Sequence, residues 1–101
     1  MSKYARKVDT NKADVISWYE GLGYSIINTS AAGNGFPDLI AVKLNYARKA
    51  WEKVFIEVKR SKYAQYTQAQ KDFNEKYPGL AVRVETFEDV KRSVQDGLIR
   101  R

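Results

Sequence analysis

Apolar residues recur with helical spacing in three segments of the chain. Because side chains three or four positions apart share one face of a helix, the spacing predicts helices over residues 9–22, 67–77 and 86–96. The residues expected at their boundaries are Asp9 or Thr10, Thr67 and Thr86 as N-caps, with Gly21, Gly23, Pro78 and Gly97 as terminators.

Four shorter segments are rich in β-branched residues and predict strands over residues 24–28, 38–42, 54–59 and 80–84. A loop of small residues and glycines, residues 29–37, separates the first two strands. The second and third strands are expected to form a hairpin, and the third and fourth to belong to a right-handed βαβ unit. The polar connection within the hairpin carries Asn45, Arg48, Lys49 and Glu52.

The resulting order, αβββαβα, is typical of an α/β fold with a mixed central sheet flanked by helices. The chain has 101 residues, of which 44% are hydrophobic and 30% are charged. This length and composition suit a globular protein with one core, so we expect residues 1–101 to form a single domain. No internal repeat, low-complexity segment or linker interrupts the pattern.

The absence of cysteine and histidine from the sequence excludes several kinds of chemistry. Disulfides, thiolate zinc sites, Ser-His triads and imidazole metal ligands all require these residues, so a metal ion would have to bind to oxygen ligands. No segment resembles a signal peptide, and no apolar run is long enough to span a bilayer. We therefore expect a protein of the reducing cytosol that does not associate with membranes.

Positive charge is concentrated in two blocks of the sequence. The chain carries 18 Lys and Arg residues against 12 Asp and Glu residues, a formal charge of +6. Much of the excess lies in residues 3–12 and 43–62, where aromatic residues are interleaved with the cations. Such blocks suit contacts with a nucleic-acid backbone, and they are also typical of a solvated surface that keeps a protein soluble. The cations that we assign to nucleic-acid binding are Lys7, Lys12, Arg60 and Lys62.

Three residues of the predicted hairpin carry side chains suited to catalysis. Alternation along the third strand places Glu57 and Lys59 together on the face opposite its aliphatic residues, so we expect this pair on an exposed face. If the strands pair, Asp38 lies beside Glu57, and two carboxylates can bind a hard cation such as Mg²⁺. Alternatively, Glu57 and Lys59 form a solvated ion pair and Asp38 caps a strand. The loop residues expected to let a phosphate backbone approach are Gly33 and Gly35.

Taken together, these residues resemble the PD-(D/E)XK nuclease superfamily, and more closely its virus-type replication-repair nuclease (VRR-NUC) branch. The matching segments are Gly33-Asn34-Gly35-Phe36-Pro37-Asp38-Leu39-Ile40, Val54-Phe55-Ile56-Glu57-Val58-Lys59 and Gln70-Lys71-Asp72-Phe73, in the order and with the spacing of that branch. The resemblance spans roughly residues 9 to 95, nearly the whole chain. It implies a restriction-endonuclease-like fold and a metal-dependent phosphodiesterase.

The resemblance also implies a role for each matching residue. Asp38 and Glu57 look like the metal-binding carboxylates, and the backbone carbonyl of Val58 looks like a further ligand. Lys59 resembles the lysine that orients the attacking water or stabilises developing charge. Gln70 resembles the polar residue on the helix that follows the core motif.

The first-helix motif of the family is only half present. The family has an acidic residue followed three positions later by glutamine, and the matching positions here are Asp9 and Lys12. Asp9 is therefore expected to be a third metal ligand, whereas Lys12 is either a phosphate contact or a sign that this motif has drifted. Asp14 and Glu20 are competing acidic candidates, and either can instead be solvated surface.

The resemblance implies a Mg²⁺-dependent DNA endonuclease, and we expect Mn²⁺ to substitute because carboxylate and water ligands suit both ions. It implies a homodimer that cuts branched DNA such as a four-way junction, without a nucleotide cofactor, in the cytosol of a bacterium or a phage-infected host. Two alternatives stay open: a basic nucleic-acid-binding module without catalysis, and a sequence-specific restriction-type nuclease. Four aromatic residues could supply a dimer face, although we expect each of them in the core: Trp18, Tyr46, Trp51 and Phe87.

Overall fold

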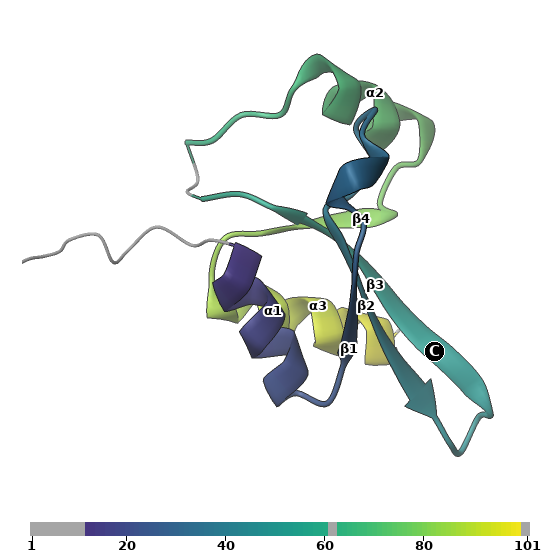
Figure 1. The fold of residues 1–101 in the computed structure, drawn as a ribbon. Helices are drawn as coiled ribbons and strands as arrows, with labels where there is room; N and C mark the ends of the chain where they lie inside the picture. Colours follow the sequence, from purple (N-terminus) through teal and green to yellow (C-terminus); the bar gives the residue numbers. More distant parts are fainter. Residues whose placement is uncertain (1–11, 61–62, 100–101) are drawn as a thin grey trace, which may run out of the picture.

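The structure, a computed structural model, describes residues 12–60 and 63–99. These residues form an α/β fold in the predicted order αβββαβα (Figure 1). The helices are α1 (Lys12–Gly21), α2 (Gln68–Lys76) and α3 (Phe87–Ile99), the strands are β1 (Ser25–Asn28), β2 (Leu39–Asn45), β3 (Ala50–Val58) and β4 (Ala81–Val84), and a 3-10 turn, η2 (Ser30–Ala32), lies in the glycine-containing loop. The predicted start of the first helix, at Asp9, lies outside the described residues.

The strands form one mixed sheet in the order β1-β2-β3-β4. β1 and β3 both run antiparallel to β2, whereas β4 runs parallel to β3 after the crossover through α2. The predicted hairpin, βαβ unit and mixed sheet are therefore confirmed. At the open end of the β2–β3 hairpin, the loop that precedes β2 therefore lies next to the segment that leads from β3 to α2.

The β2–β3 hairpin is longer than predicted. Its paired residues extend from Leu39 and Ile56 to Asn45 and Ala50, and the turn occupies only residues 46–49. Most of the predicted polar connection is therefore strand. Polar and apolar residues alternate over residues 42–45, which is the pattern of a strand exposed on one face, whereas residues 50–53 carry no such alternation.

The N-terminus of α3 is capped as predicted, but the helix does not end before Gly97. Asp89 N donates to Thr86 Oγ1 at 3.2 Å, and Thr86 N donates to Asp89 Oδ2 at 3.1 Å. The expectation that Gly97 lies beyond the helix is wrong, because α3 continues to Ile99. A glycine inside a helix costs only about 1 kcal/mol relative to alanine, too little to end a helix that packs on the sheet.

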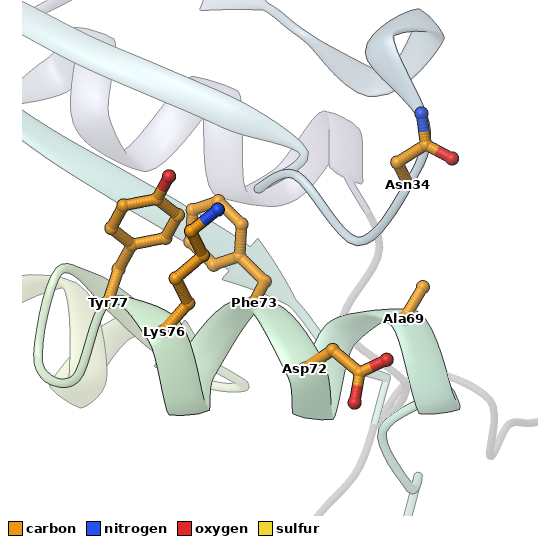
Figure 2. Close-up of a pocket in the computed structure, with 6 residues that line it drawn as sticks. All are labelled: Asn34, Ala69, Asp72, Phe73, Lys76 and Tyr77. Atoms are coloured by element: carbon orange, nitrogen blue, oxygen red, sulfur yellow. The ribbon is translucent and has the colours of Figure 1, made fainter.

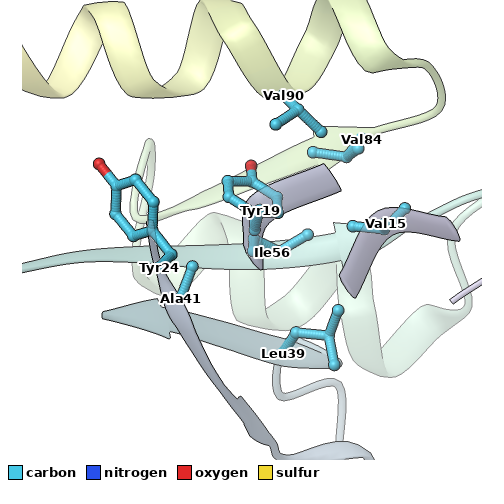
Figure 3. Close-up of a cluster of buried hydrophobic side chains, with 8 residues drawn as sticks. All are labelled: Val15, Tyr19, Tyr24, Leu39, Ala41, Ile56, Val84 and Val90. Atoms are coloured by element: carbon cyan, nitrogen blue, oxygen red, sulfur yellow. The ribbon is translucent and has the colours of Figure 1, made fainter. Parts of the chain in front are cut away.

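α1 and α3 cover one face of the sheet and enclose the hydrophobic core (Figure 3). The buried core residues are Val15, Tyr19, Tyr24, Leu39, Ala41, Ile56, Val84 and Val90. The two helices are also joined by a buried hydrogen bond of 2.6 Å between Tyr19 Oη and Ser93 Oγ. Residues 39, 41 and 56 alternate along β2 and β3 as expected for strands with one face in the core.

α2 lies on the opposite side of the sheet from α1 and α3 (Figure 1). It is attached there by aromatic rings: Phe36, in the loop before β2, stacks edge-on against Phe55 of β3 and Phe73 of α2, with ring centroids 6.3 and 5.7 Å apart. α2 therefore covers the end of the sheet that carries Glu57. Among the described helices, none is both long and apolar enough to cross a membrane.

Candidate active site

The structure brings Asp38 and Glu57 together at the start of β2 and the end of β3. Asp38 N donates to the carbonyl of Ile56 at 2.9 Å, and its carboxylate Oδ2 accepts a 3.0 Å hydrogen bond from Val58 N. The carboxylate of Asp38 therefore reaches across to the strand that carries Glu57. The backbone of Asp38 is held from the other side by Thr29, whose N–H donates to the Asp38 carbonyl at 2.9 Å.

Glu57, in β3, and Lys59, directly after it, lie close together as predicted, but the expectation that they are exposed is wrong. Glu57 is 5% exposed and Lys59 is 9% exposed. The reason is that α2 and the chain leading into it cover this end of the sheet. The alternative of a solvated surface ion pair therefore does not describe these two side chains.

Gln70 of α2 links Lys59 to Glu57. Its side-chain Oε1 accepts a 2.8 Å hydrogen bond from Lys59 Nζ, and its Nε2 donates to Glu57 Oε2. Lys59 Nζ also lies 3.9 Å from Glu57 Oε2. The predicted residues Asp38, Glu57, Lys59 and Gln70 thus form one hydrogen-bonded and charged cluster, which we call the carboxylate–lysine cluster.

The cap of α2 fixes the orientation of Gln70. Thr67 caps the helix by accepting a 3.1 Å hydrogen bond from Gln70 N, while Thr67 N donates to Gln70 Oε1 at 2.9 Å. Because Oε1 accepts from both Thr67 and Lys59, the amide nitrogen must face Glu57. The sequence predicted Thr67 as a cap but not its contact with Gln70. The signal for that contact is the Thr-x-x-Gln spacing of a capping box.

Two residues between β3 and α2 also hold Lys59, and neither contact could be predicted from a sequence pattern. Lys59 Nζ donates to the carbonyl of Gln65 at 3.2 Å and lies 5.1 Å from the centroid of the Tyr66 ring. Arg83 of β4 lies over the same ring at 5.2 Å and donates from Nη2 to the carbonyl of Ala64 at 2.6 Å. These contacts hold the segment that leads into α2 against the sheet beside Lys59.

The pKa of Glu57 is raised from 4.5 to about 7, first by burial and then by the neighbouring charge of Asp38. Lys59 and the hydrogen bond from Gln70 act in the opposite direction but do not cancel these effects. Two carboxylates that lie this close repel each other when both are ionised. A cation bound between them would remove that repulsion.

We expect the stability of the metal-free protein to depend on pH through Glu57. Its pKa is higher in the folded state than in the unfolded chain, so this carboxyl stabilises the fold below pH 4.5 and loses that effect as the pH rises towards about 7. With EDTA present, the free energy of unfolding of the wild type should fall over this range relative to Glu57→Gln, by about 3 kcal/mol at most. Urea unfolding at a series of pH values measures the difference.

The matched control is Glu20→Gln, which neutralises an exposed carboxylate on α1. Its stability should follow the wild type across the pH range apart from a small constant offset. Parallel curves for the wild type and Glu57→Gln between pH 4 and 8 would show that Glu57 is not perturbed as described.

The oxygen donors of the cluster fit a hard divalent cation. Asp38 and Glu57 supply carboxylate oxygens, the ligands that Mg²⁺ and Mn²⁺ prefer. Glu57 is a paired residue of β3, and Asp38 directly precedes β2 with its backbone bonded to Ile56. Within residues 12–60 and 63–99, no group of three or more Asp, Glu, His or Cys side chains could hold a metal ion. The predicted third ligand, Asp9, lies outside the described residues, and the role of the Val58 carbonyl stays a prediction.

The other predicted charged site residues either lie outside the described residues or are not members of the carboxylate–lysine cluster. Lys7 and Lys62 lie outside the described residues. Lys12 begins α1, and Arg60 is exposed directly after Lys59. The competing acidic candidates on α1, Asp14 and Glu20, are both exposed. Nucleic-acid binding by these cations stays a prediction.

The two glycines of the loop before Asp38 differ in their surroundings. Gly35, at φ +79°, packs on the start of α2, where an added Cβ would lie 2.1 Å from the carbonyl oxygen of Ala69. Gly33, at φ +67°, is exposed, and an added Cβ would meet no atom within 4 Å. Gly35 thus has a packing reason to be glycine, which the sequence interpretation as a phosphate contact did not include.

An open groove lies between this loop and α2, with a volume of about 390 Å³. Its lining residues are Asn34, Ala69, Asp72, Phe73, Lys76 and Tyr77 (Figure 2). In Figure 2 Asn34 lies across the groove from the side chains of α2. None of the four residues of the carboxylate–lysine cluster lines the groove, so it is separate from the candidate site.

The carboxylate–lysine cluster combines two hard oxygen ligands, one ammonium group and one oriented amide. Such a set can bind a cation through Asp38 and Glu57 while Lys59 places positive charge beside an anionic group such as a phosphate. The amide of Gln70 holds the acid and the lysine in fixed positions. No protein-family model, no curated protein and no solved structure matches the chain.

Proposed function

We propose that this protein is a Mg²⁺-dependent DNA endonuclease that hydrolyses phosphodiester bonds at the carboxylate–lysine cluster. The observation that carries the proposal is the burial of Glu57 beside Asp38, with Lys59 and Gln70 in contact. A buried acid next to a second acid lowers stability when both are charged. Such an arrangement is typical of a functional site rather than of a structural ion pair.

Each residue of the cluster has a distinct part in the proposed reaction. Asp38 and Glu57 would hold Mg²⁺, and Asp9 is the proposed third acid. When bound, the metal ion supplies charge neutralisation at the phosphate and lowers the pKa of water. Lys59, fixed by Gln70 Oε1 and the Gln65 carbonyl, presents its ammonium group to the water or to the developing negative charge.

Gln70 has a positioning role in this proposal. Its amide is held by the cap of α2, so it fixes the positions of Lys59 and Glu57 without taking part in the reaction itself. Mn²⁺ should replace Mg²⁺ because both ions accept carboxylate and water ligands. No nucleotide cofactor is required for this hydrolysis.

We further propose that the substrate is branched DNA, such as a four-way junction, cut by a homodimer in the cytosol of a bacterium or a phage-infected host. The formal charge of +6 supports a polyanionic substrate. A chain with one site would need a two-fold partner to nick two strands of a symmetric junction, and isologous pairing is the commonest way to obtain one.

The test is to incubate the purified chain with labelled single strand, linear duplex, flap and four-way junction, with Mg²⁺, Mn²⁺ or EDTA. We expect cleavage with either metal ion, none with EDTA, and preference for the junction. Binding that does not depend on metal, with no cleavage of any substrate, would instead support the non-catalytic module. Cleavage restricted to one sequence would support the restriction-type nuclease.

A further inference from the structure

The outer part of the β2–β3 hairpin, residues 42–53, projects beyond the helices (Figure 1). We call this segment the arm. It carries two of the most exposed aromatic side chains among the described residues, Tyr46 at 81% and Trp51 at 59% exposure. The sequence interpretation favoured the core for both, and that is wrong because the hairpin is long enough to carry them past the helices. An exposed tryptophan and tyrosine on one projecting hairpin indicate an interaction surface.

Trp51 lies on the same face of the sheet as the carboxylate–lysine cluster. Along β3, alternation puts residues 51, 53, 55 and 57 on one side. α2 covers this face only near Phe55 and Glu57, because its ring contacts run through Phe36 and Phe73. Further out on the same face, Lys53 and Trp51 are exposed, and level with Phe55 on the edge strand β1, Ile27 is 49% exposed. The open part of this face therefore begins where α2 ends its cover, next to the candidate site, and extends to Trp51.

The arm is strongly positive. Its cations are Lys43, Arg48, Lys49 and Lys53, and its one carboxylate is Glu52. Glu52 is on the opposite face, where it accepts hydrogen bonds from Asn45 Nδ2 at 2.8 Å and from Tyr24 Oη at 3.3 Å. The face that carries Trp51 and Lys53 therefore presents aromatic surface and positive charge without an acidic side chain from the arm.

We propose that the arm is a second nucleic-acid contact, in which Trp51 and Tyr46 stack on unpaired bases while Arg48, Lys49 and Lys53 contact phosphates. Aromatic side chains beside cations are the usual platform for strands with accessible bases. A second copy of the chain is a poorer occupant, because two-fold pairing through this face would bring two positive arms together. This inference rests on the proposed function and extends the substrate contact away from the bond that is cut.

The separation of the two contacts follows from strand geometry. Trp51 and Glu57 are six positions apart on β3, so they lie about 20 Å apart, or roughly six base pairs of duplex. The arm therefore reaches bases well away from the scissile phosphate. Arm substitutions should raise KM and leave kcat unchanged, because they remove binding without touching the reacting groups.

The experiment measures binding in a Glu57→Gln background, so that the DNA stays intact. A stacking variant carries Tyr46→Ala and Trp51→Ala, and a charge variant carries Arg48→Gln and Lys49→Gln. The control removes two exposed cations from α3 on the other side of the sheet, Lys91→Gln with Arg92→Gln. Fluorescence anisotropy with a four-way junction, a single strand and a linear duplex, at several salt concentrations, gives each Kd.

We expect the stacking variant to bind the single strand and the junction about tenfold more weakly, with a smaller loss on the duplex. The charge variant should reduce the slope of log Kd against log salt by about 1.5, since two phosphate contacts are lost. The control should change neither quantity. Equal affinities for the arm variants and their parent would overturn the proposal.

Two further outcomes separate this inference from the proposed function and from self-association. If no metal ion supports cleavage by the wild type but the arm variants still lose affinity, the nuclease proposal fails and the arm contact stands. If the stacking variant changes the sedimentation coefficient of the free protein and leaves DNA affinity unchanged, the face joins two copies and the inference is overturned.

Discussion

Replacing Asp38 by Asn or Glu57 by Gln is expected to lower Mg²⁺-dependent DNA cleavage by about 100-fold or more in each case. Changes in groups that only support metal ligands typically cost 10- to 100-fold, roughly, so loss of a ligand charge should cost at least as much. Both substitutions keep the shape of the side chain. An amide oxygen can still accept from Val58 N at position 38 or from Gln70 at position 57. The fold should therefore survive while the charge is lost.

The matched controls are Asp72→Asn and Glu75→Gln, which remove the same charges from exposed positions on α2. Initial cleavage rates on a four-way junction, with thermal unfolding measured alongside, compare the four variants. We expect the controls to cleave like the wild type. Wild-type cleavage by both Asp38→Asn and Glu57→Gln would remove the carboxylate–lysine cluster from the reaction.

The neighbouring positions of Asp38 and Glu57 could be predicted from the sequence because they depend on strand pairing alone. Alternation of period two and a short-range hairpin place the two carboxylates side by side without knowledge of the rest of the fold. The burial of Glu57 could not be predicted in this way. Periodicity tells which side chains share a face, but what covers that face depends on where the crossover helix packs.

The contacts of Gln70 also could not be predicted, because they depend on how the crossover helix packs. Its place on the helix after the core motif was predicted, but its contacts depend on how far α2 lies from β3. That distance is set by Phe36, which packs between Phe55 and Phe73, and by the absence of a side chain at Gly35. Neither constraint has a periodic signal, since each involves residues far apart in the chain.

For Trp51, a wrong prediction of where the third strand begins led to a wrong prediction of burial. The predicted third strand began at residue 54, so Trp51 fell in a connection and was favoured for the core. With β3 beginning at Ala50, it is a strand residue on an open face. Hydrophobicity alone does not tell a core aromatic from one that is exposed for binding.

Gly35→Ala is expected to destabilise the protein by about 2–4 kcal/mol, since it combines an unfavourable positive φ with a steric clash. The backbone at Gly35 has φ +79°, and the new Cβ would lie 2.1 Å from the Ala69 carbonyl oxygen. The three nearest atoms, from Ala69 and Gln70, are all backbone, so relief requires α2 to move at its N-terminus. The melting temperature should fall by roughly 10–20 °C for a chain of this size. Differential scanning calorimetry measures the loss.

The matched control is Gly79→Ala, at φ +78°, where an added Cβ meets no atom within 4 Å. It carries nearly the same backbone strain without the clash, so it should cost about 1 kcal/mol. Movement of α2 in Gly35→Ala also shifts Gln70, which holds Lys59 and Glu57, so cleavage should fall even at temperatures where the variant is fully folded. Gly79→Ala should cleave like the wild type under those conditions. Equal melting temperatures and equal rates for the two variants would show that the contact between Gly35 and α2 does not position the cluster.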